Sequence, residues 1–232
     1  MGKWFGKYDA LVVLEDDLIV SQAYYSYVSQ CVEKYYTDTR IAGISMYGFE
    51  LNYHNQRPFI PINDGNDVYF MNCAMSWGQV WMKNQWNDLY SWFIEHQEFS
   101  RDNSIPESLY NWGEKSWLKY HTRYCIENNK YFAFPYLSYT TNFSEVGVNH
   151  TELRNGNQTM YQVVMNNGQC VSLRLPNLED SQVLYDGYFE NKQLAVSLCF
   201  PDTDLCVDLN GANKNKTNKR YLLYTDKKYT NN

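Results

Sequence analysis

The stretch that most constrains the fold is residues 8–20, YDALVVLEDDLIV, where three consecutive carboxylates interrupt an apolar run. The apolar residues before them favour a strand buried on both faces, as in a sheet with helices on each side. Burying unpaired charge is costly, so the carboxylates either reach water or meet a cation. Loops beyond the carboxyl ends of parallel strands are where α/β proteins bind ligands. The sequence therefore predicts either a divalent metal held by Asp17, with Asp16 and Glu15 placed against a ligand, or a solvated acidic turn.

Composition limits the classes of protein that this chain can belong to. The chain has 232 residues, 44% of them hydrophobic, which suits one large domain or a domain with a small appendage. The net charge of −6 does not favour binding to nucleic acid or to an anionic membrane surface. The sequence contains no apolar run of about 18 residues and no signal-peptide pattern, so we expect a cytoplasmic protein with at most peripheral membrane contact. The six Cys are scattered, which argues against a zinc site and favours buried thiols in a reducing compartment.

Hydrophobic periodicity predicts an α/β core in the first two thirds of the chain. The expected elements, in chain order, are a helix at 24–36, strands at 40–46 and 67–76, helices at 82–93 and 104–124, and a strand at 131–134. Ser104 and Glu107 have the spacing of a capping box for the last of these helices. The first strand, helix and strand form one βαβ unit, which predicts parallel strands.

Beyond about residue 155 the helical periodicity disappears. Asn167-Gly168 lies between two β-like runs and predicts a type I′ hairpin. Further strands are expected at 183–189, 193–200 and 220–225. We therefore expect two parts, an α/β core at 1–155 and a small β-rich subdomain at 156–232.

The order of the motifs resembles that of a known family. The motifs are Glu-Asp-Asp at 15–17, Trp-Gly-x-x-Trp at 77–81, the pair Trp112 and Trp117, and Pro135 followed by SYTTNFS at 138–144, Gly147 and His150. This order, over residues 8–150, resembles the GT-A glycosyltransferases of the N-acetylglucosaminyltransferase I type. It resembles more closely the bacterial surface-polysaccharide sugar transferases related to them. The fold that this resemblance implies is a partial GT-A-like, Rossmann-type sheet with flanking helices.

The resemblance also implies a function and a set of site residues. The function is metal-dependent transfer of a sugar, with inversion, from a nucleoside-diphosphate donor such as a UDP-sugar to a glycan acceptor in surface polysaccharide synthesis. Asp17 is the implied protein ligand of Mn²⁺ or Mg²⁺, which both prefer oxygen ligands. Glu15 and Asp16 lie against the donor, although Glu15 can instead pair with a nearby basic residue. His150 approaches the diphosphate or the metal, or is an ordinary loop histidine.

An inverting transferase needs one carboxylate to deprotonate the acceptor hydroxyl. The family places this base in a Trp-acid-acid-Trp setting, whereas this chain has Trp-Gly-Glu-Lys-Ser-Trp at 112–117. Glu114 is the nearest acid, and on a helix it faces away from the Trp112 side. Asp102 and Glu107 are the alternatives.

Aromatic residues near the motifs are further candidates for contacts with sugar. Trp77, Trp81 and Tyr139 can either stack on sugar rings or belong to the core. The chain contains 22 Tyr, 11 Phe and 7 Trp, so most of its aromatic residues are expected in the core.

Three classes of function remain open from the sequence. GT-A enzymes build the nucleotide pocket from roughly 100 residues before the triplet, about the size of an α/β domain, and here 14 residues precede Glu15. This difference predicts an exposed strand edge and a companion chain that supplies the missing half, or a noncatalytic, carbohydrate-binding or truncated remnant of such an enzyme. A phosphohydrolase or nucleotidyltransferase is disfavoured, because no second acidic cluster or phosphate-binding Gly loop occurs.

Overall fold

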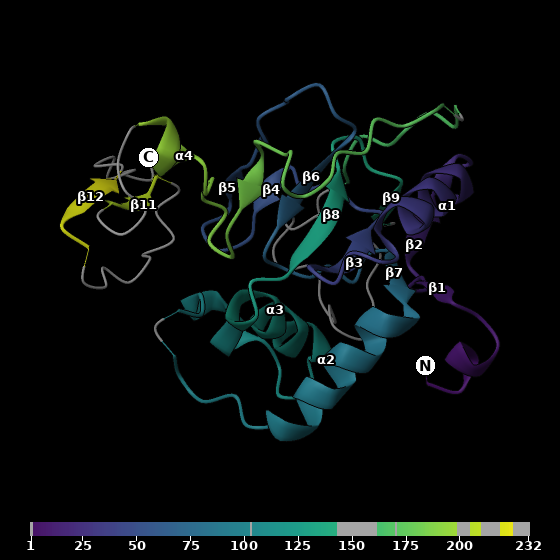
Figure 1. The fold of residues 1–232 in the computed structure, drawn as a ribbon, viewed down its shortest axis with the longest axis horizontal. Helices are drawn as coiled ribbons and strands as arrows, with labels where there is room; N and C mark the ends of the chain where they lie inside the picture. Colours follow the sequence, from purple (N-terminus) through teal and green to yellow (C-terminus); the bar gives the residue numbers. More distant parts are fainter. Residues whose placement is uncertain are drawn as a thin grey trace, which may run out of the picture.

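A computed structural model describes residues 2–102, 104–142, 162–169, 171–198, 205–209 and 219–224, without the side chains of 195 and 196. Its centre is a six-stranded mixed sheet in the order β1-β7-β3-β8-β6-β10 (Figure 1). Three strands run parallel to one another: β1 (Ala10–Val13), β3 (Ile41–Ser45) and β8 (Tyr131–Pro135). The other three run in the opposite direction: β7 (Gln79–Met82), β6 (Val68–Met71) and β10 (Leu184–Tyr185).

Helices cover both faces of this sheet, as Figure 1 shows. Helix α1 (Tyr24–Tyr35) packs on one face, and helices α2 (Lys83–Glu95) and α3 (Trp117–Glu127) pack on the other. Strand β6 contributes to both cores, because Phe70 packs with the α1 residues and Tyr69 packs with those of α2 and α3. The mixed α/β class predicted from the sequence is therefore confirmed.

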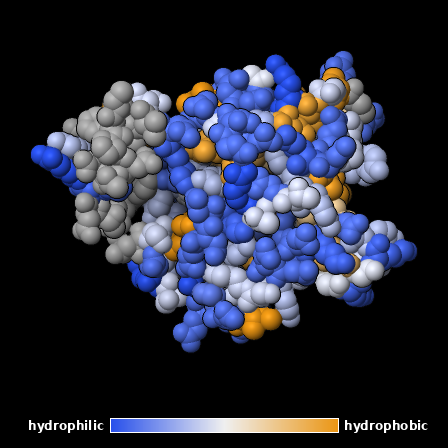
Figure 2. All heavy atoms as spheres, in the orientation of Figure 1, coloured by the Kyte–Doolittle hydropathy of each residue, from blue (hydrophilic) through white to orange (hydrophobic). Residues whose placement is uncertain are grey.

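Short elements connect and extend these layers. They are η1 (Trp4–Gly6), β2 (Leu18–Val20), β4 (Leu51–Asn52), β5 (Arg57–Pro58), η2 (Glu107–Asn111), β9 (Thr140–Asn142), α4 (Leu194–Ser197), β11 (Leu205–Asp208) and β12 (Tyr221–Tyr224). Strand β2 pairs with β9, β4 with β5, and β11 with β12. None of the described helices combines the length and the apolar character needed to cross a bilayer. Figure 2 shows a largely hydrophilic face on which apolar residues form small separate groups.

Strand β7 is the element that the sequence pattern missed. No strand was expected within the Trp-Gly-x-x-Trp segment, but Gln79–Met82 is a strand. The helix expected at 82–93 is confirmed as α2, which begins at Lys83. All four residues of β7 are buried, because the strand lies between β1 and β3, with α2 and α3 on one face and α1 on the other. A strand with two buried faces has no apolar–polar alternation, so its sequence does not distinguish it from a buried helical turn.

The single helix expected at 104–124 is wrong. The 3₁₀ helix η2 ends at Asn111, a turn follows, and α3 begins at Trp117. The capping box also does not form. The Ser104 hydroxyl donates to Asp102 (2.5 Å) and Glu107 forms an ion pair with Arg101 (2.8 Å). Asp102 also accepts the backbone N–H of Ser104 (2.7 Å), and this local turn competes with helix initiation.

Strand β1 is the outermost strand of the sheet, and within the described residues no strand pairs with its other edge. Val12 is 37% exposed and Leu14 is 43% exposed. The expectation that this run is buried on both faces is therefore wrong, since an edge position leaves its side chains uncovered. The exposed strand edge expected next to the acidic triplet is present.

The segment after residue 161 packs against the core instead of forming the expected hairpin. Residues flanking Gly168 do not pair with each other in the described part of this segment, and Met165 forms a bridge with Ser138. The Gln30 side chain accepts the backbone N–H of Leu173 (2.9 Å). These partners satisfy the backbone groups that a hairpin ladder would otherwise use.

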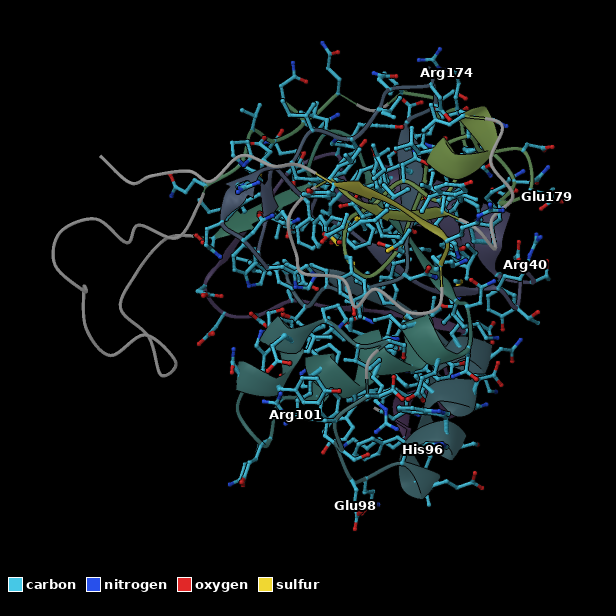
Figure 3. All side chains as sticks on the ribbon, turned by 90° about the vertical axis from the view of Figure 1, so that its left-hand side faces the viewer. Arg40, His96, Glu98, Arg101, Arg174 and Glu179 are labelled. Atoms are coloured by element: carbon cyan, nitrogen blue, oxygen red, sulfur yellow. The ribbon has the colours of Figure 1, made fainter. Side chains whose placement is uncertain are left out.

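The chain after residue 173 is also attached to the central sheet, by ion pairs and by strand β10. Arg40 contacts Asp38 (2.6 Å) and Glu179 (2.5 Å), and Figure 3 shows Arg40 and Glu179 on the same side of the molecule. Strand β10 then pairs with β6. The strand expected at 193–200 is wrong, since α4 forms there, and the strand expected at 220–225 is confirmed as β12. The domain boundary at 155/156 stays a prediction, because residues 143–161 lie outside the described residues.

The buried His121 predicts a pH-dependent stability. This residue of α3 lies between Trp81 (4.8 Å between ring centroids) and Phe132 (4.9 Å), and burial lowers its pKa to about 3. An unfolded histidine binds a proton below about pH 6.5, whereas the folded one does not. The free energy of unfolding should therefore fall as the pH decreases from 6.5 towards 4, by up to about 1.4 kcal/mol per pH unit for this group.

Urea titrations between pH 4 and 8 measure this dependence. The variant His121→Gln should show a shallower slope below pH 6.5 than the wild type. It should show the wild-type slope at pH 7–8, where a neutral histidine takes up no proton in either state. An unchanged slope below pH 6.5 would contradict this origin of the pH dependence.

Candidate functional site

The acidic triplet lies where several connections meet at one edge of the sheet. Because β1, β3 and β8 run parallel, the segments that follow them all leave from this edge, and β7 begins there. The triplet follows β1, Met46 follows β3, and Ser138 follows β8. This confirms that the triplet sits beyond the carboxyl end of a strand, where α/β folds place their ligand sites.

The backbone on both sides of the triplet is fixed by pairing. Before it, Val13 is in register with Gln79 of β7. Within it, the backbone N–H of Leu18 donates to the Glu15 carbonyl (3.3 Å), which closes a turn. After it, Leu18 is in register with Asn142 of β9. The three carboxylates are therefore carried on a short turn anchored by two different strand pairs.

Glu15 is an exposed residue whose carboxyl group is partly desolvated. Desolvation is the main cause that raises its pKa, and the neighbouring charges of Asp17 and Asp16 raise it further. The Ser76 hydroxyl donates a hydrogen bond to the carboxylate, which acts in the opposite direction. Among the described residues no Lys or Arg forms an ion pair with Glu15. The described residues therefore do not support the alternative in which Glu15 pairs with a basic residue.

Asp17 has a buried carboxylate oxygen that bears on whether the site can hold a cation. Its side chain is half-buried, and the oxygen Oδ1 is fully buried without a hydrogen-bond partner in the described part of the chain. A buried carboxylate oxygen without a partner is costly, and a bound cation would remove that cost. Carboxylate oxygen also matches the ligand preference of Mg²⁺ and Mn²⁺.

The rest of a metal coordination shell is not supplied by protein groups that the structure describes. Within the described residues, no three His, Cys, Asp or Glu side chains are arranged so that together they could hold a metal ion. This fits a cation held by one carboxylate and by the phosphate oxygens of a ligand, which is a common arrangement for Mg²⁺. The histidine predicted for the site, His150, lies outside the described residues.

The segment Ser76-Trp77-Gly78 packs against the loop after β8. Gly78 has φ +85°, and a Cβ there would lie 2.8 Å from Thr140 Cγ2 and 3.0 Å from Met46 Cβ. The Thr140 hydroxyl donates to the carbonyl of Trp77 (2.7 Å). This close approach brings Ser76 into contact with Glu15, so the conformation at Gly78 helps to position the triplet.

The three aromatic candidates for sugar stacking differ in exposure. Trp81 is 1% exposed and Tyr139 is 5% exposed, so both belong to the core. Trp77 is only partly buried and packs edge-to-face on Tyr47 (4.9 Å between ring centroids). Trp117 at the start of α3 was not a candidate, yet it is 42% exposed and lies 5.6 Å from Trp81. Of these four residues, Trp77 and Trp117 therefore retain surface for a ligand.

Glu114 lies in the turn before α3, not on a helix as expected. The turn is closed by the backbone N–H of Ser116, which donates to the Gly113 carbonyl (2.9 Å), and Glu114 is exposed. Trp117, the first residue of α3, packs on Trp81 of β7 (5.6 Å between ring centroids), and Trp81 is in register with Leu11 within β1. Among the described residues, no hydrogen bond or ion pair joins Glu114 to the triplet.

The two alternative bases are engaged in local contacts. Asp102 accepts both the hydroxyl and the backbone N–H of Ser104, and these hydrogen bonds lower its pKa. Glu107 forms its ion pair with Arg101. A carboxylate with a lowered pKa is a weaker base, so Glu114 is preferred over Asp102.

Comparison with known proteins adds no family to this description. No protein-family model matches the chain, and no curated protein is significantly similar to it in sequence. Any assignment of function to this chain therefore rests on the fold, the site and the order of the motifs.

The close packing at Gly78 predicts a strong effect of one added methyl group. Gly78→Ala should destabilise the protein by about 1–3 kcal/mol, because alanine is strained at this φ and its Cβ collides with Thr140 and Met46. Gly113→Ala is the matched control, since nothing lies within 4 Å of its added Cβ. Urea unfolding measures both, and equal stability of the two variants would contradict the proposed constraint.

Proposed function

We propose that this protein is a metal-dependent glycosyltransferase. It would move a sugar from a nucleoside-diphosphate donor, such as a UDP-sugar, to a glycan acceptor with inversion, in bacterial surface polysaccharide synthesis. The observation that carries the proposal is the buried, unpartnered Oδ1 of Asp17, within the described residues, on an acidic turn at the carboxyl edge of an α/β sheet. The order of the motifs along the chain supports the same class.

Each residue of the triplet has its own proposed role. Asp17 would hold Mn²⁺ or Mg²⁺, and such an ion neutralises charge on a diphosphate leaving group. Glu15 and Asp16 would contact the donor. The partly desolvated carboxyl group of Glu15 suits a hydrogen bond from a sugar or ribose hydroxyl, which would replace part of the hydration that it loses. His150 stays a proposed donor or metal contact.

Glu114 is the proposed base. It is exposed, and it forms no ion pair with any residue that the structure describes. An exposed carboxylate of this kind could accept a proton from an acceptor hydroxyl without first breaking a salt bridge. Proton removal by such a group typically contributes a factor of about 10²–10⁴ to the rate.

A noncatalytic, carbohydrate-binding or truncated remnant of such an enzyme is the second candidate. The edge position of β1 favours it, because the triplet strand ends the described sheet and leaves one side of the site open. A companion chain that pairs with β1 would instead complete the site and is compatible with the first proposal. The two candidates differ in whether the protein binds a nucleotide and a metal together.

Binding of nucleoside diphosphate distinguishes these candidates. Isothermal titration with UDP should give binding that requires Mn²⁺ and that is lost in Asp17→Ala, because the metal ligand is removed. Asp88→Ala, which removes an exposed carboxylate on α2, should bind as the wild type does. If UDP and other nucleoside diphosphates fail to bind with Mn²⁺ present, the transferase proposal fails for this chain and the remnant is favoured.

The role of Glu114 is tested separately from donor binding. Glu114→Gln should keep Mn²⁺-dependent UDP binding and lower sugar transfer by about 10²-fold or more, since an amide cannot accept the proton. Glu95→Gln, at the exposed end of α2, is the matched control and should transfer normally. Unchanged turnover in Glu114→Gln would exclude Glu114, and Glu107→Gln would then test the next acid.

A further inference from the structure

A histidine and a serine from distant parts of the chain meet away from the acidic triplet segment. His54 lies between β4 and β5, Ser108 lies in η2, and Gly187 follows β10. The ring nitrogen Nδ1 of His54 is hydrogen-bonded to Ser108 Oγ, and Nε2 is 2.7 Å from the carbonyl oxygen of Gly187. Three segments that lie far apart in the sequence thus converge on one imidazole.

The contacts define which ring nitrogen carries the proton. A carbonyl oxygen only accepts hydrogen bonds, so Nε2 must be protonated and donate to Gly187. In the neutral ring Nδ1 is then an acceptor, and the Ser108 hydroxyl donates to it. Burial lowers the pKa of His54 to about 4, so the ring is neutral at pH 7 and keeps this tautomer. The arrangement is that of a hydroxyl held by a base whose other nitrogen is oriented by a third group.

The surroundings hold the pair in place and bury it in part. The backbone N–H of His54 donates to Asn52 Oδ1 (2.9 Å), and the ring packs on Tyr53 (4.2 Å between centroids) and Phe189 (5.4 Å). Phe189 has φ +66°, a strained conformation for a non-glycine residue, and such strain clusters at functional sites. Both His54 and Ser108 are only partly buried.

We propose that Ser108 and His54 form a nucleophile–base pair that accepts the acyl group of a carboxylic ester. Ser108 Oγ attacks the ester carbonyl carbon while its proton moves to His54 Nδ1. The bond from the carbonyl carbon to the leaving oxygen breaks, and that oxygen takes the proton from Nδ1 and departs as an alcohol. Water then hydrolyses the acyl-serine by the same proton transfers, which returns Ser108 and releases a carboxylic acid.

This activity is independent of the proposed sugar transfer, because it uses none of the triplet residues or Glu114. A purely structural link between the three segments would use the same hydrogen bonds. The two roles differ in the reactivity of Ser108. Only an activated serine reacts selectively with an electrophile, since an ordinary serine hydroxyl is a weak nucleophile at neutral pH.

A phosphonofluoridate probe tests this reactivity on the full chain at pH 7.5. Ser108 Oγ should displace fluoride and give one covalent adduct, which peptide mass spectrometry locates at Ser108. Ser108→Ala should lose the adduct, and His54→Gln should label at least about 10-fold more slowly, because its amide can still donate to Gly187 but cannot accept the proton. p-Nitrophenyl acetate hydrolysis should fall in parallel in both variants.

The control is Ser104→Ala, which removes a nearby exposed serine whose hydroxyl donates to Asp102. It should label at the wild-type rate. His54→Asn is the second substitution of the base if circular dichroism shows that His54→Gln is not folded. An absent adduct at Ser108, or an equal labelling rate in a folded His54 variant, would overturn the proposal.

Discussion

The close approach of three chain segments at Gly78 is the constraint on which the rest of the site depends. Its backbone carbonyl accepts the N–H of Met46 (2.8 Å), and its missing Cβ leaves room for Thr140. The segment before β7 is thereby joined to the segments that follow β3 and β8. Ser76 reaches Glu15 from this position. A larger residue at position 78 would push these segments apart and would move Ser76 away from Glu15.

The parts of the fold predicted from sequence are those with a clear periodic signal. Helix α1 and the strands β3 and β8 have uninterrupted apolar patterns, and each appears where expected. Strand β7 was missed because burial on both faces removes the alternation that identifies a strand. The hairpin at Gly168 was predicted from a strong local turn signal, but Ser138 and Gln30 supply hydrogen-bond partners from far along the chain. A local sequence pattern does not reveal hydrogen-bond partners that come from distant parts of the chain.

The site was predictable only to the extent that its residues are adjacent in sequence. The position of the triplet after a strand follows from the sequence, and the structure places it there. The contact of Glu15 with Ser76 could not be predicted, since it depends on the unexpected strand β7. Glu114 was placed on a helix by its Trp spacing, whereas it lies in a turn that the backbone N–H of Ser116 closes on the Gly113 carbonyl. Side chains that are brought together only by the path of the chain are not identified by their spacing in the sequence.

Electrostatics at the triplet favour a cation over a carbohydrate alone. Desolvation, and after it the charges of Asp17 and Asp16, raise the pKa of Glu15, and Asp17 has a buried oxygen without a hydrogen-bond partner among the described residues. A sugar hydroxyl could donate to one of these oxygens, but it would leave the repulsion among the carboxylates unchanged. A divalent cation would satisfy the Asp17 oxygen and attract the other two carboxylates, which lowers the cost of keeping them close. One bound ion would therefore offset both the unpartnered Asp17 oxygen and the repulsion among the carboxylates. A sugar hydroxyl in a noncatalytic site would offset only the first.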